Sequence, residues 1–160
     1  MKIFVTGSSG FIGFHLSKKL LEIGHNVHGF DSMNNYYDVK VKKARLKILK
    51  KYEKFSFTKS KLENRKTLSS VILKFKPTII VHLAAQAGVR YSIEKPRVYL
   101  DSNITGTYNI IELAKKVNIK HLLIASSSSV YGANKKLPFK ETDKTETQLS
   151  IYAATKKSTE

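Results

Sequence analysis

Residues 2–13 read KIFVTGSSGFIG, a short apolar run that leads into three evenly spaced glycines. Gly7 permits a tight turn, because glycine tolerates backbone angles that other residues avoid. Gly10 lets the backbone approach a pyrophosphate, and Gly13 lets the following helix pack closely against the strand. The stretch therefore predicts the strand, the phosphate-binding turn and the helix of a dinucleotide-binding fold.

The segment that begins at Gly10 has the pattern of an amphipathic helix over residues 10–23, which Gly24 ends. The first amides of a helix have no partner within it, and the helix dipole places partial positive charge at the same end. We therefore expect Phe11 and Ile12 to contact the cofactor together with the three glycines. The predicted apolar face of this helix consists of Phe11, Ile12, Leu16, Leu20, Leu21 and Ile23.

A second apolar run, residues 26–30, leads into Asp31, which lies 18 residues after Gly13. An acid at this place in a dinucleotide fold accepts hydrogen bonds from both hydroxyls of the adenosine ribose. It also repels the 2′-phosphate of NADP, and residues 32–35 contain no lysine or arginine to offset that repulsion. The sequence therefore favours NAD. The alternative is that Asp31 only caps the loop at residues 32–35.

Short β-branched or aromatic runs alternate with longer amphipathic ones along the whole chain. Parallel strands need crossover connections, and these crossovers are right-handed. The fold class is therefore α/β, a doubly wound parallel (Rossmann) sheet with strand order 3-2-1-4-5. The predicted strands are residues 2–6, 26–30, 55–59, 78–83 and 121–126, and the further helices are residues 40–51, 64–74 and 98–117.

The chain has 160 residues, of which 41% are apolar, enough for one core and too few for two ordinary domains. A last helical pattern begins near Ser150 and continues to Glu160, and neither a terminating glycine nor a final strand follows it. We therefore expect one NAD-binding Rossmann domain over residues 1–160. We expect it to be truncated within the helix that carries Tyr152 and Lys156, with the C-terminal substrate region absent.

The formal net charge is +17, and most of the excess is lysine spread through residues 40–76 without interleaved aromatic stacking pairs. A solvated surface is therefore favoured, and a specific nucleic-acid interface is the alternative. The chain has no cysteine, which excludes disulfides, thiolate metal sites and thiol catalysis. Nothing ties it to an oxidising compartment, so a cytoplasmic location is expected. No apolar stretch is long enough to span a membrane.

Tyr152 and Lys156 stand four residues apart, which places both side chains on one face of the last helix. A lysine cation lowers the pKa of a nearby tyrosine hydroxyl and so makes it a base for a sugar hydroxyl during hydride transfer. Upstream, residues 126–129 put a row of serine hydroxyls at the carboxyl edge of the sheet, where such folds bind ligands. Taken alone, the pair would indicate a surface contact and the serines a polar turn.

These motifs, in this order and spacing, resemble those of extended short-chain dehydrogenases/reductases that act on nucleotide sugars. The resemblance covers the whole chain and includes residues 82–85 (HLAA) and 103–107 (NITGT). Within that family, the chain is most similar to UDP-glucuronate 4-epimerases, followed by UDP-glucose 4-epimerases. The stretches that carry this finer resemblance are residues 31–38 (DSMNNYYD), 84–92 (AAQAGVRYS) and 126–132 (SSSSVYG).

The resemblance implies a tightly held NAD that takes a hydride from C4 of a UDP-sugar, rotation of the 4-keto sugar, and return of the hydride to the opposite face. Tyr152 would be the base, and Lys156 would tune its pKa and bind ribose. Ser127 would be the hydroxyl partner, with Ser128 the second candidate. The further implied site residues are Leu83, Ala84 and Ala85 along the cofactor, Asn103 as a brace for the neighbouring helix, and Gln86 and Arg90 at the substrate.

Three residues bear on how far the resemblance extends. Ser128 and Ser129 stand where the family's 4,6-dehydratases carry an Asp-Glu pair that eliminates water, so a dehydratase is a weaker alternative. Lys61 stands at or near the position where relatives place an aspartate against adenine, so that contact does not carry over. The remaining alternative is a non-catalytic NAD-binding fragment, because relatives use another domain's length for the sugar pocket. The full-length parent is expected to form a homodimer.

Overall fold

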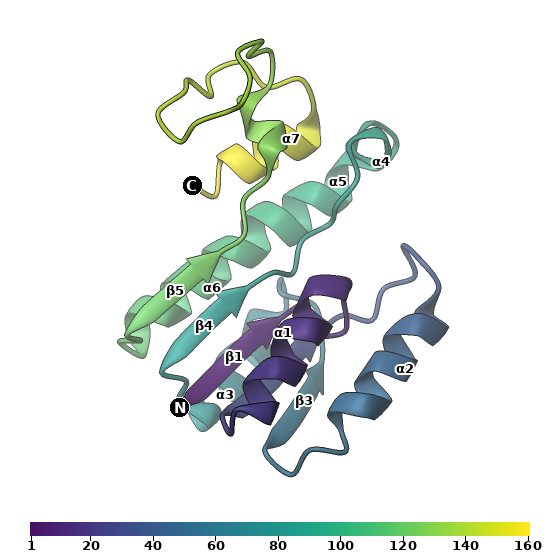
Figure 1. The fold of residues 1–160 in the computed structure, drawn as a ribbon, viewed down its shortest axis with the longest axis vertical. Helices are drawn as coiled ribbons and strands as arrows, with labels where there is room; N and C mark the ends of the chain where they lie inside the picture. Colours follow the sequence, from purple (N-terminus) through teal and green to yellow (C-terminus); the bar gives the residue numbers. More distant parts are fainter.

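A five-stranded parallel sheet forms the centre of the molecule (Figure 1). The computed structural model describes residues 1–160. The strand order is β3-β2-β1-β4-β5, which confirms the predicted doubly wound topology. β4 and β5 are shorter than predicted, since their last predicted residues already belong to the loops at the sheet edge. The strands are β1 (Lys2–Thr6), β2 (Asn26–Asp31), β3 (Phe55–Lys59), β4 (Ile79–His82) and β5 (His121–Ile124).

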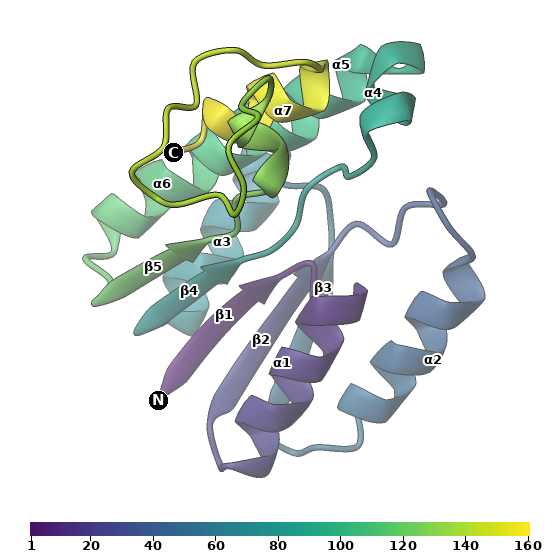
Figure 2. The same ribbon diagram turned by 45° about the horizontal axis from the view of Figure 1, so that its top comes forward.

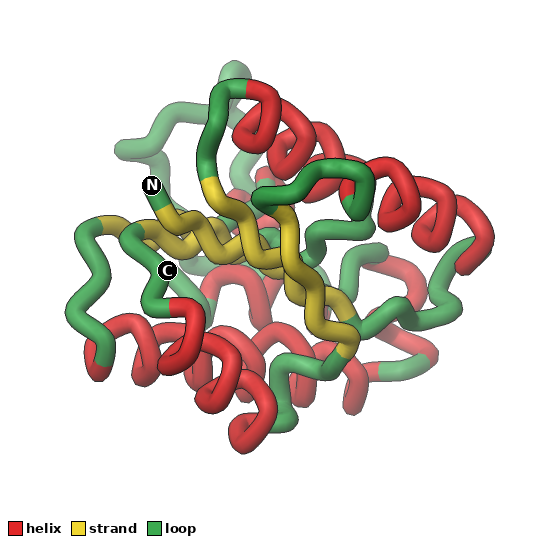
Figure 3. The backbone as a smooth tube through the Cα atoms, turned by 90° about the horizontal axis from the view of Figure 1, so that it is seen from below, coloured by secondary structure: helices red, strands yellow, loops and turns green.

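Helices cover both faces of the sheet (Figure 2). Side chains of β1 alternate between the faces, so that Phe4 packs against α3 (Arg65–Phe75) and α6 (Gly106–Lys116). Ile3 and Val5 pack on the other face against α1 (Phe11–Glu22) and α2 (Val39–Leu49). Figure 3 shows the sheet between these two layers. Because β1 is buried on both faces, its sequence is a continuous apolar run instead of an alternating one.

Local signals mark where several helices start and stop. The side chain of Asp38 accepts a hydrogen bond from the amide of Lys40 and caps α2. Asn64 caps α3 in the same way, and Ser150 caps α7 (Ile151–Lys157) at the predicted start. Gly24 follows α1 with φ of 88°, a left-handed conformation that glycine adopts without strain. No helix combines the length and the apolar character that crossing a lipid bilayer requires.

The helix predicted at residues 98–117 is more complex than its sequence pattern. It starts earlier, as α5 (Pro96–Tyr99), and continues through a π-helical segment, η1 (Leu100–Thr105), before α6. A π turn inserts one extra residue into the helical repeat, which a search for a 3.6-residue period does not detect. The short helix α4 (Val89–Glu94) and the 3₁₀ turn η2 (Ser128–Tyr131) were not predicted. Both are too short to show a period.

The predicted apolar face of α1 was only partly right, because Leu21 is buried as predicted but the other five residues are not. Phe11, Ile12 and Ile23 are exposed. Leu16 and Leu20 are only half-buried. The physical reason is the contact between Gly13 and the glycine turn, which fixes the rotation of the helix about its axis. The residues of α1 that are buried are Gly13, Phe14, Ser17 and Leu21.

We expect the core between the sheet and α3 to dominate stability on that face. Leu68 is fully buried there, whereas Leu73 on the same helix is 40% exposed. Leu68→Ala should lower the free energy of unfolding by roughly 2–5 kcal/mol, because it removes apolar contacts and leaves a cavity. Leu73→Ala, the matched control, should cost less than about 1 kcal/mol. Denaturant titrations of both variants measure the difference, and equal losses would contradict this view of the core.

Candidate functional site

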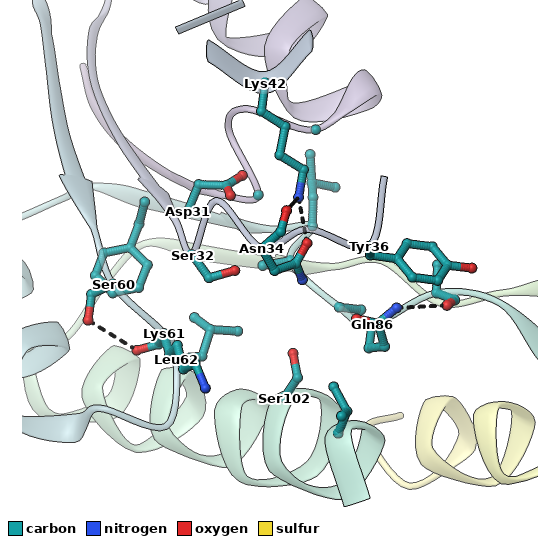
Figure 4. Close-up of a pocket in the computed structure, with 18 of the residues that line it drawn as sticks. Asp31, Ser32, Asn34, Tyr36, Lys42, Ser60, Lys61, Leu62, Gln86 and Ser102 are labelled. Carbon is teal, nitrogen blue, oxygen red and sulfur yellow. Dashed lines mark hydrogen bonds between the residues drawn. The ribbon is translucent and has the colours of Figure 1, made fainter. Parts of the chain in front are cut away.

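A pocket of about 290 Å³ opens at the carboxyl edge of the sheet (Figure 4). It is lined by the glycine turn after β1, the loop after β2, residues 60–63 after β3 and residues 83–87 after β4. Ligands bind at this edge in doubly wound folds, next to the point where the strand order reverses. No group of three or more metal-ligating side chains occurs in the molecule. The expected cofactor residues that line the pocket are Gly7, Gly10, Asp31, Leu83, Ala84 and Ala85.

Gly7 and Gly13 lie too close to other backbone atoms to carry side chains. Gly7 has φ of 70°, and a Cβ atom there would lie 3.0 Å from the backbone nitrogen of Ala84. A Cβ atom on Gly13 would collide with the peptide group of Gly7, at 2.7 Å from its carbonyl carbon. Gly7 therefore shapes the pocket wall, and Gly13 lies behind the turn, where it makes a packing contact and does not line the pocket.

The N-terminus of α1 faces the pocket with free amides. Gly10 is its N-cap and offers no side-chain cap, and the first helical hydrogen bond runs from Phe14 N–H to the Gly10 carbonyl. No acidic residue occupies the first turn, so this end of the helix is suited to an anion such as a pyrophosphate. The side chains of Phe11 and Ile12 are 67% and 65% exposed. Their backbone amides are therefore the groups that suit a phosphate contact.

Asp31 connects the glycine turn to the loop after β2. Its Oδ2 atom accepts a hydrogen bond from the amide of Ser9 at 3.0 Å, and its Oδ1 atom accepts one from the amide of Met33 at 2.8 Å. The residue is buried and also lines the pocket. Each carboxylate oxygen can accept a second hydrogen bond. Asp31 therefore caps the loop, as the alternative interpretation proposed, and still has lone pairs for ribose hydroxyls.

A buried hydrogen-bond chain holds the loop after β4 against β1. The hydroxyl of Thr6 accepts from the amides of Leu83 and Ala84 at 3.1 and 3.0 Å, so its own proton points to His82 Nδ1 at 2.7 Å. His82 then carries its proton on Nε2 and donates to the Thr107 hydroxyl at 2.9 Å. Burial lowers the pKa of His82 from 6.5 to about 3, and the Lys156 cation acts in the same direction. The pocket wall at residues 83–84 is thus held by Thr6 of β1 directly and, through His82, by Thr107 of α6.

Asn103 joins the pocket to α7. It is 1% exposed, and its Oδ1 atom accepts from the amide of Gln86 at 2.7 Å. Its Nδ2 atom donates to the Gln86 carbonyl and to the Thr155 hydroxyl, both at 3.1 Å. Gln86 lies at the pocket and Thr155 lies on the helix of Tyr152. The π-helical segment therefore places one amide side chain where it ties these two parts together.

Tyr152 and Lys156 lie on α7, which packs against η1, η2 and α4. Tyr152 is half-buried, and its ring meets the ring of Tyr99 edge-on at 6.1 Å between centroids. Lys156 is 7% exposed, and its Nζ atom donates to the carbonyl oxygen of Ala125 at the end of β5. Burial lowers the pKa of Lys156, while the negative charge of Glu160 raises it. The lysine cation is thus held at the carboxyl end of the sheet.

The two serines proposed for the site differ in their surroundings. Ser127 is half-buried, and its hydroxyl accepts a hydrogen bond from the amide of Ser129 at 3.2 Å, which caps η2. Ser128 is exposed. Because η2 packs against α7, both serines lie at the same end of the sheet as Tyr152. The hydroxyl of Ser127 still has a proton to donate.

The two residues proposed at the substrate lie in different environments. Gln86 is 4% exposed and lines the pocket, and its side chain donates to the Ala87 carbonyl at 3.1 Å. Arg90 is exposed on α4. Sequence reasoning missed Lys42 and Tyr36, which also line the pocket. Nothing in a lysine-rich segment distinguishes Lys42 from its neighbours, because only the packing of α2 turns it inward.

The neutral state of His82 predicts a pH-dependent stability. Below pH 6.5 the unfolded chain binds a proton at His82, but the folded chain does not until about pH 3. The unfolded state therefore binds more protons, and stability should fall as the pH is lowered from about 7 to about 5, by up to roughly 1.4 kcal/mol per unit. His82→Gln should reduce this slope, and the exposed control His121→Gln should not. Denaturant titrations at each pH measure it, and an unchanged slope in His82→Gln would contradict the assignment.

Comparison with known proteins gives matches along the whole chain. A family model described as GDP-mannose 4,6 dehydratase matches residues 4–160. The chain is 57% identical to protein CapI of Staphylococcus aureus and 49% identical to a probable UDP-glucuronate 4-epimerase of Rhizobium meliloti (strain 1021), with 100% of the chain covered in each case. The matches cover 48% and 47% of these proteins, so the chain spans about half the length of the curated relatives it matches.

Solved structures of similar proteins share the fold. The UDP-glucuronic acid 4-epimerase of Bacillus cereus, in complex with UDP-glucuronic acid and NAD, matches with a TM-score of 0.91 and 32% identity over 99% of the chain and 50% of that protein. The UDP-glucose 4-epimerase of Thermotoga maritima with UDP-glucose matches with a TM-score of 0.84 and 31% identity over 99% of the chain and 48% of that protein. The chain therefore belongs to the family that the GDP-mannose 4,6-dehydratase model describes, the extended short-chain dehydrogenases/reductases of nucleotide sugars, and its relatives include UDP-glucuronate 4-epimerases.

Proposed function

We propose that residues 1–160 form one NAD-binding Rossmann domain, the cofactor half of an NAD-dependent UDP-sugar 4-epimerase that acts on UDP-glucuronate. The observation that carries the proposal is the pocket in which the open N-terminus of α1 and the Asp31 carboxylate meet. The similarity to a UDP-glucuronic acid 4-epimerase solved with NAD and UDP-glucuronic acid supports it further. UDP-glucose is the second candidate substrate, on the similarity to UDP-glucose 4-epimerases.

The pocket has the groups that NAD requires. The close backbone approach at Gly7 and Gly10 and the free first-turn amides of Phe11 and Ile12 would hold the pyrophosphate. Asp31 would accept from the adenosine ribose, and residues 83–85 would line the cofactor with small or apolar groups. Lys61 also lines the pocket, and it would meet the adenine end in place of an acid.

When bound, NAD supplies a reversible hydride acceptor for C4 of the sugar. Tyr152 would remove the proton of the C4 hydroxyl during oxidation and return it after the sugar has rotated. Lys156, whose ammonium is buried at the end of β5, would stabilise the tyrosinate and bind the cofactor ribose. The hydroxyl of Ser127 would hold the reacting oxygen, with Ser128 as the second candidate.

Sugar binding and dimerisation would need a protein of the relatives' length. The relatives are about twice as long as this chain, and a sugar pocket needs a wall opposite α7 to bury its ligand. Gln86 would contact the sugar from the cofactor half, and Arg90 would read a substrate charge. Dimerisation through helices is proposed for the longer protein only. For residues 1–160 we expect NAD binding with little or no turnover.

A 4,6-dehydratase is the second candidate, because the family model that matches the chain is described by that activity. Elimination of water across C5 and C6 of the sugar needs an acid and a base beside those carbons. The chain has Ser128 and Ser129 at the positions expected for them, and a serine hydroxyl serves poorly in either role at neutral pH. Product analysis separates the candidates, since epimerisation leaves the mass of the sugar nucleotide unchanged and dehydration lowers it by one water.

Cofactor binding by the isolated chain is a direct test of the proposal. The purified 160-residue chain should bind NAD in calorimetry and bind NADP much more weakly, because Asp31 would face the 2′ position of the ribose. NAD at a hundred times its Kd should stabilise the fold by roughly 2.7 kcal/mol, which a thermal melt detects as a higher Tm. Absence of both effects would refute the proposed cofactor site. If this chain alone epimerised UDP-glucuronate, the proposal that it supplies no more than the cofactor half would be wrong.

A further prediction concerns the base. Tyr152→Phe should lower kcat by roughly 10²–10⁴-fold, because it removes the proton acceptor. The variant is made in a form of this protein that has measurable activity on UDP-glucuronate. NAD affinity should change little, since the ring and its contact with Tyr99 are kept. Tyr108→Phe on α6, where the tyrosine is 54% exposed, is the matched control and should leave kcat unchanged. Full activity of Tyr152→Phe in isotope exchange at C4 would remove Tyr152 from the mechanism.

A further inference from the structure

Lys42 is a buried cation at the wall of the pocket (Figure 4). It is 5% exposed, and its Nζ atom donates to the carbonyl oxygen of Asn34 at 2.9 Å and to Asn34 Oδ1 at 2.6 Å. The ammonium also lies 4.5 Å from the centre of the Tyr37 ring. None of the ion pairs in the structure includes Lys42. Lysines buried to this extent are rarely left without an acid, so the site suits a further partner.

An ammonium group has three N–H donors, and Asn34 accepts two of those of Lys42. No oxygen or nitrogen atom of the protein accepts the third, and the Tyr37 ring lies beside the ammonium. Burial lowers the pKa of Lys42, the negative charge of Asp31 raises it, and the positive charge of Arg45 lowers it. Asp31 projects from β2 and Lys42 from α2 to the same end of the pocket (Figure 4). The free donor therefore lies near the carboxylate proposed for the adenosine ribose.

Arg45 adds a second cation at this end of the pocket. It lies three residues after Lys42 on α2, and its guanidinium donates to the carbonyl oxygen of Ser9 at 3.4 Å and to the Tyr37 hydroxyl at 3.1 Å. Ser9 is the residue whose amide donates to Asp31. Asp31 and Lys42 thus line the pocket, and Arg45, which does not line it, contacts Ser9 and the pocket residue Tyr37.

We infer that Lys42 is a ribose-binding residue. We also infer that Lys42 and Arg45 would attract the 2′-phosphate of NADP, so that only the Asp31 carboxylate excludes this nucleotide. This inference rests on the proposed NAD site. The third N–H of Lys42 donates to a ribose hydroxyl, while Asp31 accepts from one. A 2′-phosphate carries up to two negative charges, which Asp31 repels and the two cations attract. Without the Asp31 carboxylate, the pocket presents an arrangement that suits NADP.

Calorimetric titration of the 160-residue chain with NAD and with NADP tests the inference. Lys42→Met should weaken NAD binding roughly tenfold, because it removes a charged hydrogen-bond donor. Asp31→Asn should improve NADP binding relative to NAD roughly tenfold, and adding Lys42→Met should abolish that gain. Lys43→Met is the matched control, since Lys43 is exposed on the same helix, and it should change neither Kd by more than about twofold.

Lys42→Gln is the second variant in case Lys42→Met does not melt cooperatively. It keeps a donor for the Asn34 carbonyl and removes the charge, so it too should abolish the NADP gain of Asp31→Asn. If the NADP gain survives in these double variants, or if Lys42→Met binds NAD as tightly as Lys43→Met, the inference is wrong, while NAD binding by the wild type leaves the proposed function intact. A wild-type chain that binds neither nucleotide overturns both.

Discussion

The Cα atom of Gly13 lies against the peptide group of Gly7, and the geometry of the pocket depends on that contact. A Cβ atom on Gly13 would collide with the carbonyl group of Gly7, so α1 can lie this close to the turn only because residue 13 is glycine. The contact fixes the rotation of α1. That rotation leaves Phe11 and Ile12 exposed and turns the uncapped N-terminus toward the pocket.

The pocket and the proposed catalytic residues are connected by buried polar groups. The Thr6, His82 and Thr107 side chains fix the loop after β4 between β1 and α6. Asn103 then connects this loop to α7 through Gln86 and Thr155. Buried networks of this kind hold their members in one geometry, since each group lost leaves another one unpaired in a low-dielectric interior. Movement of α7 relative to the cofactor loop is therefore costly.

The family match identifies the fold and the relatives of the chain, whereas the reaction depends on single side chains at the site. The match over residues 4–160 places the chain in a family described by a dehydratase activity. Fold and family do not fix the reaction, because the reaction depends on particular side chains at the site. The proposed epimerisation rests in part on Ser128 and Ser129, which would replace the acid and the base that elimination needs. The sequence similarity to UDP-glucuronate 4-epimerases agrees with that reading.

The sequence by itself determined the glycine turn and the start of α7 at Ser150, because each depends on local signals that act within a few residues. It also determined the strand order, because alternating strands and helices allow few topologies. Tertiary structure alone decided the buried face of α1, the π-helical segment at Asn103 and the inward position of Lys42. The loop at residues 32–35 contains no lysine or arginine, yet α2 places the Lys42 cation at the pocket next to this loop. Close packing between segments distant in the chain sets such features, and no local pattern of residues records it.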